Sequence, residues 1–190
     1  MDGQTLRNHF LIAMPSLKDP NFVQAVIYII AHDAENGATG VVINRETDLK
    51  LTDVMAKAGL KVIDGVEIPD HVYIGGPVQT ERGFVLHEPS GRYMMSENVS
   101  KDVSFTQSRD VLSQIARGAG PEKRLFCLGY AGWLKGQLES ELAQDVWLTV
   151  EASPAVLFDV PASDRYEAAL GLLGIDSETL RYAEGSAGHA

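Results

Sequence analysis

The sequence predicts an α+β fold, in which helices pack on a mixed β-sheet. Apolar, β-branched runs bounded by turn residues indicate strands, and the first of them are arranged as a hairpin. Further along the chain, strand-like runs alternate with amphipathic segments, which favours helical crossovers within the same sheet. The length of 190 residues suits one domain over residues 1–190, and a hydrophobic content of 45% can supply its core.

The N-terminal part of the chain is typical of strands joined by turns. The first apolar segment runs from Phe10 to Met14. Residues 23–43 are expected to form a β-hairpin, because Asn36-Gly37 is a strong turn signal between two apolar runs. The first of these runs, residues 22–31, is nearly continuous in apolar side chains, so it is predicted to be buried on both faces.

The later elements follow from periodicity and turn residues. Thr52 is expected to cap a short helix that reaches Ala58 and stops at Gly59. Either Thr106 or Ser108 is expected to cap a second helix, and Asp164 begins a third that Gly174 closes. The other predicted segments are strands at 71–74, 82–87, 99–105, 125–128 and 146–150, and a helix at 137–143.

Charge argues against nucleic-acid binding. The formal net charge is −10, and residues 136–184 contain ten acidic residues but only Arg165 and Arg181 as bases. Affinity for DNA comes largely from Lys and Arg that neutralise phosphates, so this C-terminal third would repel a duplex. We therefore expect no direct nucleic-acid binding, and interpret the acidic segment as a solvated surface.

Several features predict a cytoplasmic protein without a membrane segment. The longest apolar run, Ala25 to Ala31, is far shorter than the ~20 residues that span a bilayer. The start of the chain lacks the pattern of a signal peptide. Cys127 is the single cysteine, so no internal disulfide can form. Because it lies within an apolar run, its thiol is expected to be buried and inert.

Familiar catalytic and metal-binding motifs are absent from the sequence. It contains no phosphate-binding loop, dinucleotide fingerprint, zinc-protease helix or nucleophile elbow. No histidine has an acidic or histidine partner at a helical metal-ligand spacing, and one cysteine makes a structural zinc site improbable. We therefore assign no catalytic residue, no metal and no cofactor.

Two glycine-rich segments remain as candidate ligand-binding sites. The first contains Gly75, Gly76, Pro77 and Gln79, followed by His87 on the next strand. Paired glycines allow positive φ angles or very close approach of the backbone, so the segment is either a tight turn or a loop whose amides face a ligand. His87 is either a hydrogen-bonded structural imidazole or an acid–base group beside that loop.

The second segment leads from a buried strand through a glycine loop into a helix. Free amides at such a helix start can hold an anion, although Lys135 is the one base nearby. Its aromatic side chains either stack on a ligand or fill the core. The candidate residues of this segment are Gly129, Tyr130, Gly132, Trp133, Gly136, Gln137 and Glu139. Both segments follow strands, so we expect them to lie side by side.

Several long motifs resemble the AlgH/YqgE family, in the same order along the chain. They are Asn8–Pro15, Asp19–Phe22, Gly40–Asn44, Gly75–Gln79, Gly83–His87, Leu128–Trp133, Gly136–Glu139, Trp147-Leu148 and Gly188–Ala190. This chain departs from the family pattern with Ala31 where Glu is usual, Leu134-Lys135 after the tryptophan, and Asp145 where Asn is usual. The resemblance implies an α+β domain with a mixed, partly split sheet.

The resemblance implies a regulatory label but no catalytic residue or cofactor. The family takes its name from a regulator of alginate synthesis, and its members are often labelled transcriptional regulators. We expect a non-enzymatic regulatory or binding module whose partner is a small molecule or a protein, and leave its oligomeric state open. The alternative is a hydrolase or transferase of unfamiliar type, in which His87 acts as acid–base and loop amides hold an oxyanion.

Overall fold

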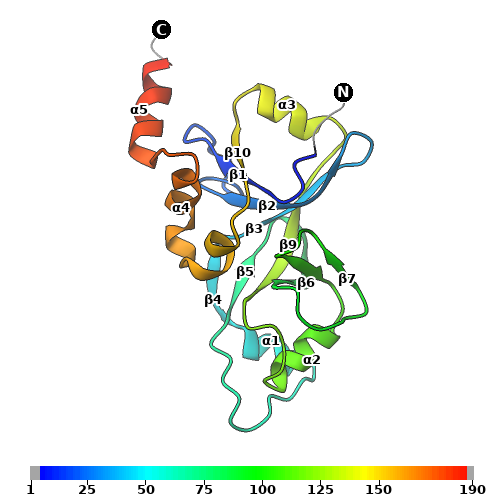
Figure 1. Cartoon of the computed structure of the whole chain (residues 1–190). Coiled ribbons are helices and arrows are strands. Elements are labelled where there is room, and N and C mark those ends of the chain that lie inside the picture. The colour runs from blue at the N-terminus through cyan, green and yellow to red at the C-terminus, as the bar shows by residue number, and fades with distance from the viewer. Residues whose placement is uncertain (1–4, 188–190) are drawn as a thin grey trace.

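The computed structural model describes residues 5–187, in which ten strands form one curled sheet with helices packed around it (Figure 1). The main path of the sheet is β10-β1-β2-β3-β9-β6-β8-β7, with β5 pairing to β4 and β9. The strands are β1 (His9–Ala13), β2 (Val26–Asp33), β3 (Gly37–Val42), β4 (Glu46–Lys50), β5 (His71–Ile74), β6 (Val78–His87), β7 (Ser96–Asn98), β8 (Ser104–Thr106), β9 (Arg124–Trp133) and β10 (Trp147–Glu151).

The sheet is mixed, and β9 is the strand around which it divides. One edge of β9 pairs antiparallel with β6. On the other edge, the first half of β9 pairs parallel with β5, with Tyr73 opposite Cys127. The second half pairs antiparallel with β3, with Ala38 opposite Trp133. The expected α+β class and mixed sheet are therefore confirmed.

Helices cover the sheet at separate places (Figure 1). They are α1 (Leu51–Lys57), α2 (Asp110–Ala116), α3 (Gln137–Ala143), α4 (Arg165–Gly171) and α5 (Ser177–Ala187), with short helical turns at Ala155–Asp159 and Ala162–Asp164. The first two lie together at one end of the molecule, α3 lies at the opposite end, and α5 projects from the body. Within residues 5–187 we find no helix with the length and apolar character that crossing a bilayer would require.

Alternating side chains of the central strands build cores on both faces of the sheet. Phe10 and Ile12 of β1 join the core beneath α4, whereas Leu11 and Ala13 face the core beneath α3. All five residues from Val26 to Ile30 of β2 are buried, which confirms a strand covered on both faces for this part of the predicted run 22–31, whereas residues 22–24 form a turn and Ala31 is exposed. A third core lies where α1 and α2 meet β5, β6 and β9.

A buried arginine ties α4 to the sheet. The Arg165 side chain is almost fully buried, and its Nη1 donates to the Ile43 carbonyl and to the Tyr73 hydroxyl at 2.6 and 3.0 Å. Its Nε donates to the Val160 carbonyl at 2.9 Å. The guanidinium also lies 5.2 Å from the centre of the Tyr73 ring. These contacts satisfy a charge that would otherwise be costly to bury.

Some expected elements are confirmed, and others are wrong. The hairpin of β2 and β3 and the helix at Gln137–Ala143 lie where predicted. Residues 99–105 are not one strand, because the Val99 amide donates to the Val103 carbonyl and turns the chain between β7 and β8. The motif Gly188–Ala190 and the chain start, residues 1–4, lie outside the described residues.

Of the predicted helix boundaries, the stop at Gly59 is confirmed and Asp164 stands at the N-cap position of α4, but the other predicted caps are wrong. Thr52 lies inside α1, which begins after Lys50, and Thr106 belongs to β8. Ser108 donates to the Asp110 side chain instead of capping α2, and Asp164 precedes α4 without a side-chain cap bond. Ser, Thr and Asp side chains also form local hydrogen bonds that do not cap a helix, and sequence spacing alone does not separate these bonds from caps.

Candidate functional site

The two glycine segments lie side by side, as expected, because the link between β5 and β6 passes from one edge of β9 to the other at this point. The Gly75 amide donates to the Leu128 carbonyl at 2.8 Å. A Cβ atom at Gly76 would stand 2.2 Å from the Tyr130 carbonyl oxygen, and one at Gly129 would stand 2.4 Å from that of Gly76. Any side chain at these positions would therefore collide with backbone. These three glycines serve packing within the sheet.

The second segment begins as a strand, which corrects its interpretation as a loop. Residues Gly129 to Trp133 belong to β9, and Trp133 is only 6% exposed. Its Nε1 donates to Glu141 Oε1 at 2.9 Å, and Trp147 Nε1 donates to the same oxygen at 2.8 Å. The two indole rings meet edge to face with centroids 6.3 Å apart. Trp133 therefore fills the core beneath α3 and does not face a ligand.

The start of α3 is occupied by the chain's own side chains. Gln137 Oε1 accepts the Leu134 amide at 3.0 Å, and Gly136 has a φ of +78° that turns the chain into the helix. Exposed Glu139 accepts a hydrogen bond from His32 Nε2 at 2.9 Å, because His32 Nδ1 already accepts the Leu6 amide. This bond lowers the pKa of the Glu139 carboxyl. Gln137 and Glu139 therefore hold α3 in place through hydrogen bonds to neighbouring residues. Two other candidates are exposed: Gly132 lies in β9, and Pro77 directly precedes β6.

His87 is a structural imidazole. The side chain is 1% exposed, Nδ1 donates to the Glu88 carbonyl at 2.6 Å, and Nε2 lies 2.7 Å from the Thr106 hydroxyl. Burial lowers the pKa of His87, so the neutral ring is favoured. His87 pairs with Arg124 at the start of β9, whereas Trp133 ends that strand. The two side chains do not line one cleft.

An open pocket lies beside the crossing of the glycine segments, and we call it the aromatic pocket. Its volume is about 220 Å³. The residues that line it come from β2, β3, β6, β9 and the end of β8, and they are Ile30, Thr39, Arg82, Phe84, Phe105, Gln107 and Tyr130. Of the candidates predicted from sequence, Tyr130 lines this pocket, and Gln79 supports it through Arg82.

Irregular backbone on three strands shapes the aromatic pocket. The pairing of β2 with β3 shifts between Ile29 and Ala31, which leaves Ile30 in a β-bulge. The pairing of β6 with β9 shifts between Val78 and Gly83, so residues 79–82 form an excursion opposite Gly129. Gln79 and Gly129 have φ angles of 47° and 78°. Bulges reorient side chains, and here Ile30 and Arg82 are the ones that reach the pocket.

The guanidinium of Arg82 is held at the pocket by two amides. Nη1 donates to Gln79 Oε1 at 3.2 Å, and Nη2 donates to Gln107 Oε1 at 2.9 Å. Within residues 5–187, Arg82 has no carboxylate at ion-pair distance. The Phe84 and Phe105 rings lie 4.9 Å apart at 54°, so the pocket combines aromatic walls with a fixed positive charge.

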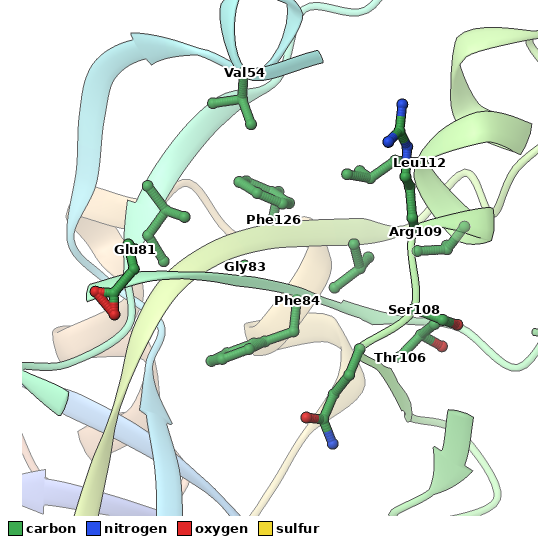
Figure 2. Close-up of a pocket in the computed structure, with 13 residues that line it drawn as sticks. Val54, Glu81, Gly83, Phe84, Thr106, Ser108, Arg109, Leu112 and Phe126 are labelled. Atoms are coloured by element: carbon green, nitrogen blue, oxygen red, sulfur yellow. The ribbon is translucent and has the colours of Figure 1, made fainter. Parts of the chain in front are cut away.

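A second pocket lies across β6, and we call it the α2 pocket (Figure 2). Its volume is about 210 Å³. Val54, Leu112 and Phe126 gather on one side of the β6 and β9 ribbons, whereas Phe84 points to the other side. Phe84 and Gln107 line both pockets, so the two share a wall. Glu81 lines the α2 pocket, whereas its neighbour Arg82 lines the aromatic pocket.

Most of the residues that line the aromatic pocket were not predicted from the sequence as candidate site residues. Arg82, Phe84 and Phe105 sit in segments predicted as ordinary strands, and Gln107 lies in a turn. The available signal was a charged pair, Glu81-Arg82, between turn residues and an apolar strand. Within the part of the chain that the structure describes, no group of three His, Cys, Asp or Glu side chains could hold a metal ion.

Comparison with models of protein families identifies the family of this chain. The model of the AlgH-like family matches residues 10–178. The chain belongs to the AlgH-like family. Curated family members include a "UPF0301 protein" from Laribacter hongkongensis, 49% identical with full coverage of both chains, and one from Thiobacillus denitrificans, 50% identical with the same coverage.

Two solved structures share the fold described above. The solution structure of the AlgH protein from Pseudomonas aeruginosa is 43% identical, covers 95% of each chain and gives a TM-score of 0.76. A crystal structure of a protein from Corynebacterium diphtheriae is 20% identical, covers 88% of this chain and 86% of its own, and gives a TM-score of 0.67. The names of these relatives and structures state no biochemical activity, so the function is inferred from the site.

Proposed function

We propose that this AlgH-like protein is a non-catalytic binding module whose ligand is a small molecule seated in the aromatic pocket. The observation that carries the proposal is the convergence of two register shifts, one between β2 and β3 and one between β6 and β9, at one pocket. Regular strand pairing would stabilise the sheet better, so departures that converge at one place favour a role in binding.

The alternative of an unfamiliar hydrolase or transferase loses its proposed base. His87 is buried and lies outside the lining of the aromatic pocket, and both of its ring nitrogens have protein partners. The amides of the first glycine segment pack against β9 and cannot hold an oxyanion there. Neither group can reach a substrate in this arrangement.

A regulatory role would follow from ligand binding without contact to DNA. A net charge of −10 opposes association with a duplex, whereas an occupied pocket can change the shape of the adjoining surface. The neighbouring exposed side chains of Met94 and Met95 could then present that change to a protein partner. We place this activity in the cytoplasm, because a chain with a single cysteine forms no internal disulfide and suits a reducing compartment.

A thermal-shift screen against soluble metabolites tests the proposal. A ligand at ~100 times its dissociation constant stabilises the native state by about 2.7 kcal/mol, which is readily measured as a rise in Tm. Tyr130→Ala should abolish the rise, because Tyr130 lines the pocket. The matched control is Tyr182→Ala, which removes the same ring from a position 78% exposed on α5.

Each variant is compared with its own ligand-free Tm, so loss of stability from the substitution does not enter the result. The proposal is supported if a metabolite raises the Tm of the wild type and of Tyr182→Ala but not of Tyr130→Ala. It is overturned if the screen yields no ligand, or if Tyr130→Ala responds as strongly as the wild type.

A further inference from the structure

The charge at the aromatic pocket restricts what it can bind. Gln79 and Gln107 supply neutral amide oxygens, so they orient the Arg82 guanidinium without neutralising it. Glu81, the adjacent acid, lines the α2 pocket and does not line the aromatic pocket. Glu97 of β7 lies opposite Phe105, but among residues 5–187 no carboxylate is within ion-pair distance of Arg82. An anionic group on the ligand is the complement that it lacks.

The guanidinium is also presented in a fixed orientation. Nη1 and Nη2 each donate one hydrogen to an amide, which leaves their other N–H groups available. Gln79 lies in the β6 excursion at a φ of 47°, and Gln107 follows β8, so the two amides hold Arg82 from different segments. A pre-oriented guanidinium suits the two-oxygen face of a carboxylate or phosphate, and less of its rotamer entropy is lost on binding.

The walls of the pocket select the rest of the ligand. Phe84, Phe105 and Tyr130 present aromatic surface, and Ile30 adds an apolar contact. Flat rings stack on such surfaces more favourably than branched or saturated groups of equal area. A dry cavity of about 150 Å³ accommodates benzene, so a volume of about 220 Å³ suits one or two fused rings.

We infer that the ligand is a planar aromatic anion of one or two rings, with a carboxylate or phosphate paired to Arg82 and the ring against the wall that Phe84, Phe105 and Tyr130 form. This inference rests on the proposed function, because it assigns a chemical class to the same pocket. Arg82 is the residue that determines specificity for charge, and the three aromatic residues determine it for shape.

Four probes separate charge from planarity. 2-Naphthoate and 1-naphthyl phosphate carry both properties, 2-naphthamide keeps the ring without the charge, and cyclohexanecarboxylate keeps the charge without the flat ring. Dissociation constants are measured by amide chemical-shift titration of the full chain, with resonances of Phe84, Phe105 and Tyr130 as reporters of the site. We expect at least one planar anion to bind about tenfold more tightly than either 2-naphthamide or cyclohexanecarboxylate.

Arg82→Gln tests the residue itself, with Arg117→Gln as the matched control. Arg117 is exposed at the end of α2 and outside the aromatic pocket, so the control removes the same charge from a remote position. Arg82→Gln should weaken the planar anion about tenfold and leave 2-naphthamide unchanged, whereas Arg117→Gln should change neither. Raising the salt concentration should weaken the anion in the wild type but not in Arg82→Gln.

The outcomes distinguish the inference from the function on which it rests. If 2-naphthamide binds at the pocket as tightly as 2-naphthoate, or Arg82→Gln binds anions like the wild type, the anionic class is wrong while ligand binding stands. If cyclohexanecarboxylate matches 2-naphthoate, the planar class is wrong. If no probe shifts the reporter resonances, the inference is overturned, and the metabolite screen then decides separately whether the pocket binds any ligand. A preference between carboxylate and phosphate identifies the head group.

Discussion

Replacement of Trp133 by alanine tests the assignment of this residue to the core. The side chain is 6% exposed and packs edge to face on Trp147, with centroids 6.3 Å apart. Removal of a buried Trp side chain costs ~3–5 kcal/mol, and loss of the aromatic pair places this site in the upper part of that range. In the variant, Glu141 Oε1 still accepts the hydrogen bond from Trp147 Nε1, so the substitution leaves no carboxylate oxygen without a partner. We expect a loss of about 4–5 kcal/mol.

The assay is urea unfolding followed by far-UV circular dichroism, with thermal unfolding as a second measurement. For a chain of this size, 1 kcal/mol corresponds to a Tm change of roughly 2–4 °C, so Trp133→Ala should lower the Tm by about 8–20 °C. The matched control is Leu134→Ala, since Leu134 is the next residue and is 79% exposed. Its unfolding free energy should change by less than about 0.5 kcal/mol.

A loss below about 1 kcal/mol for Trp133→Ala would refute the argument and restore Trp133 as a surface residue available to a ligand. If the variant does not fold, Trp133→Phe supplies the measurement, because it keeps a ring in the site. It should lose the hydrogen bond to Glu141 and part of the packing, and unfold at an intermediate urea concentration.

Three further predictions concern the thiol, the acidic surface and α3. Burial raises the pKa of the Cys127 thiol to about 12, so a thiol reagent should label the protein only after denaturant is added, and rapid native labelling would contradict this. Purified protein should not bind duplex DNA with sub-micromolar affinity at physiological salt in a fluorescence anisotropy titration; tight binding with a steep salt dependence would show the opposite. The pKa of Glu139 is lowered by His32, so its stabilising effect is present above the ordinary carboxyl value and lost as pH falls through the lowered one. Tm measurements should therefore show Glu139→Gln below the wild type at pH 7 and the difference vanishing in acid; a constant difference would argue against the bond.

Most elements were predicted correctly from local sequence patterns. Most wrong predictions concern segments whose conformation depends on pairing with a strand that is distant in the sequence. The β2–β3 hairpin and α3 depend on signals within a few residues, so they lie where expected. Residues 99–105 alternate like a strand, but Val99 and Val103 close a turn whose position is fixed by β6, the partner of β8. The helix α5 was not predicted, because its apolar pattern is weak.

The same distinction explains what was missed in the site. Tyr130 was predicted as a candidate because an aromatic residue in a glycine-rich segment before a helix can stack on a ligand. Arg82 was not, because its direction depends on the offset between β6 and β9, which are about forty residues apart along the chain. His87 was an ambiguous candidate, and only its burial beside Thr106 separates a structural imidazole from a catalytic one.

The position of β9 has a consequence for how the chain is made. Strands β3, β5 and β6 all precede β9, yet each needs it as a neighbour, and β1 receives its outer partner β10 only after β9 has been synthesised. During translation the first 123 residues therefore expose unpaired strand edges until Arg124 to Trp133 leave the ribosome. Insertion of this one strand joins both halves of the sheet, so truncations before it should aggregate, and the completed chain should unfold as one cooperative unit.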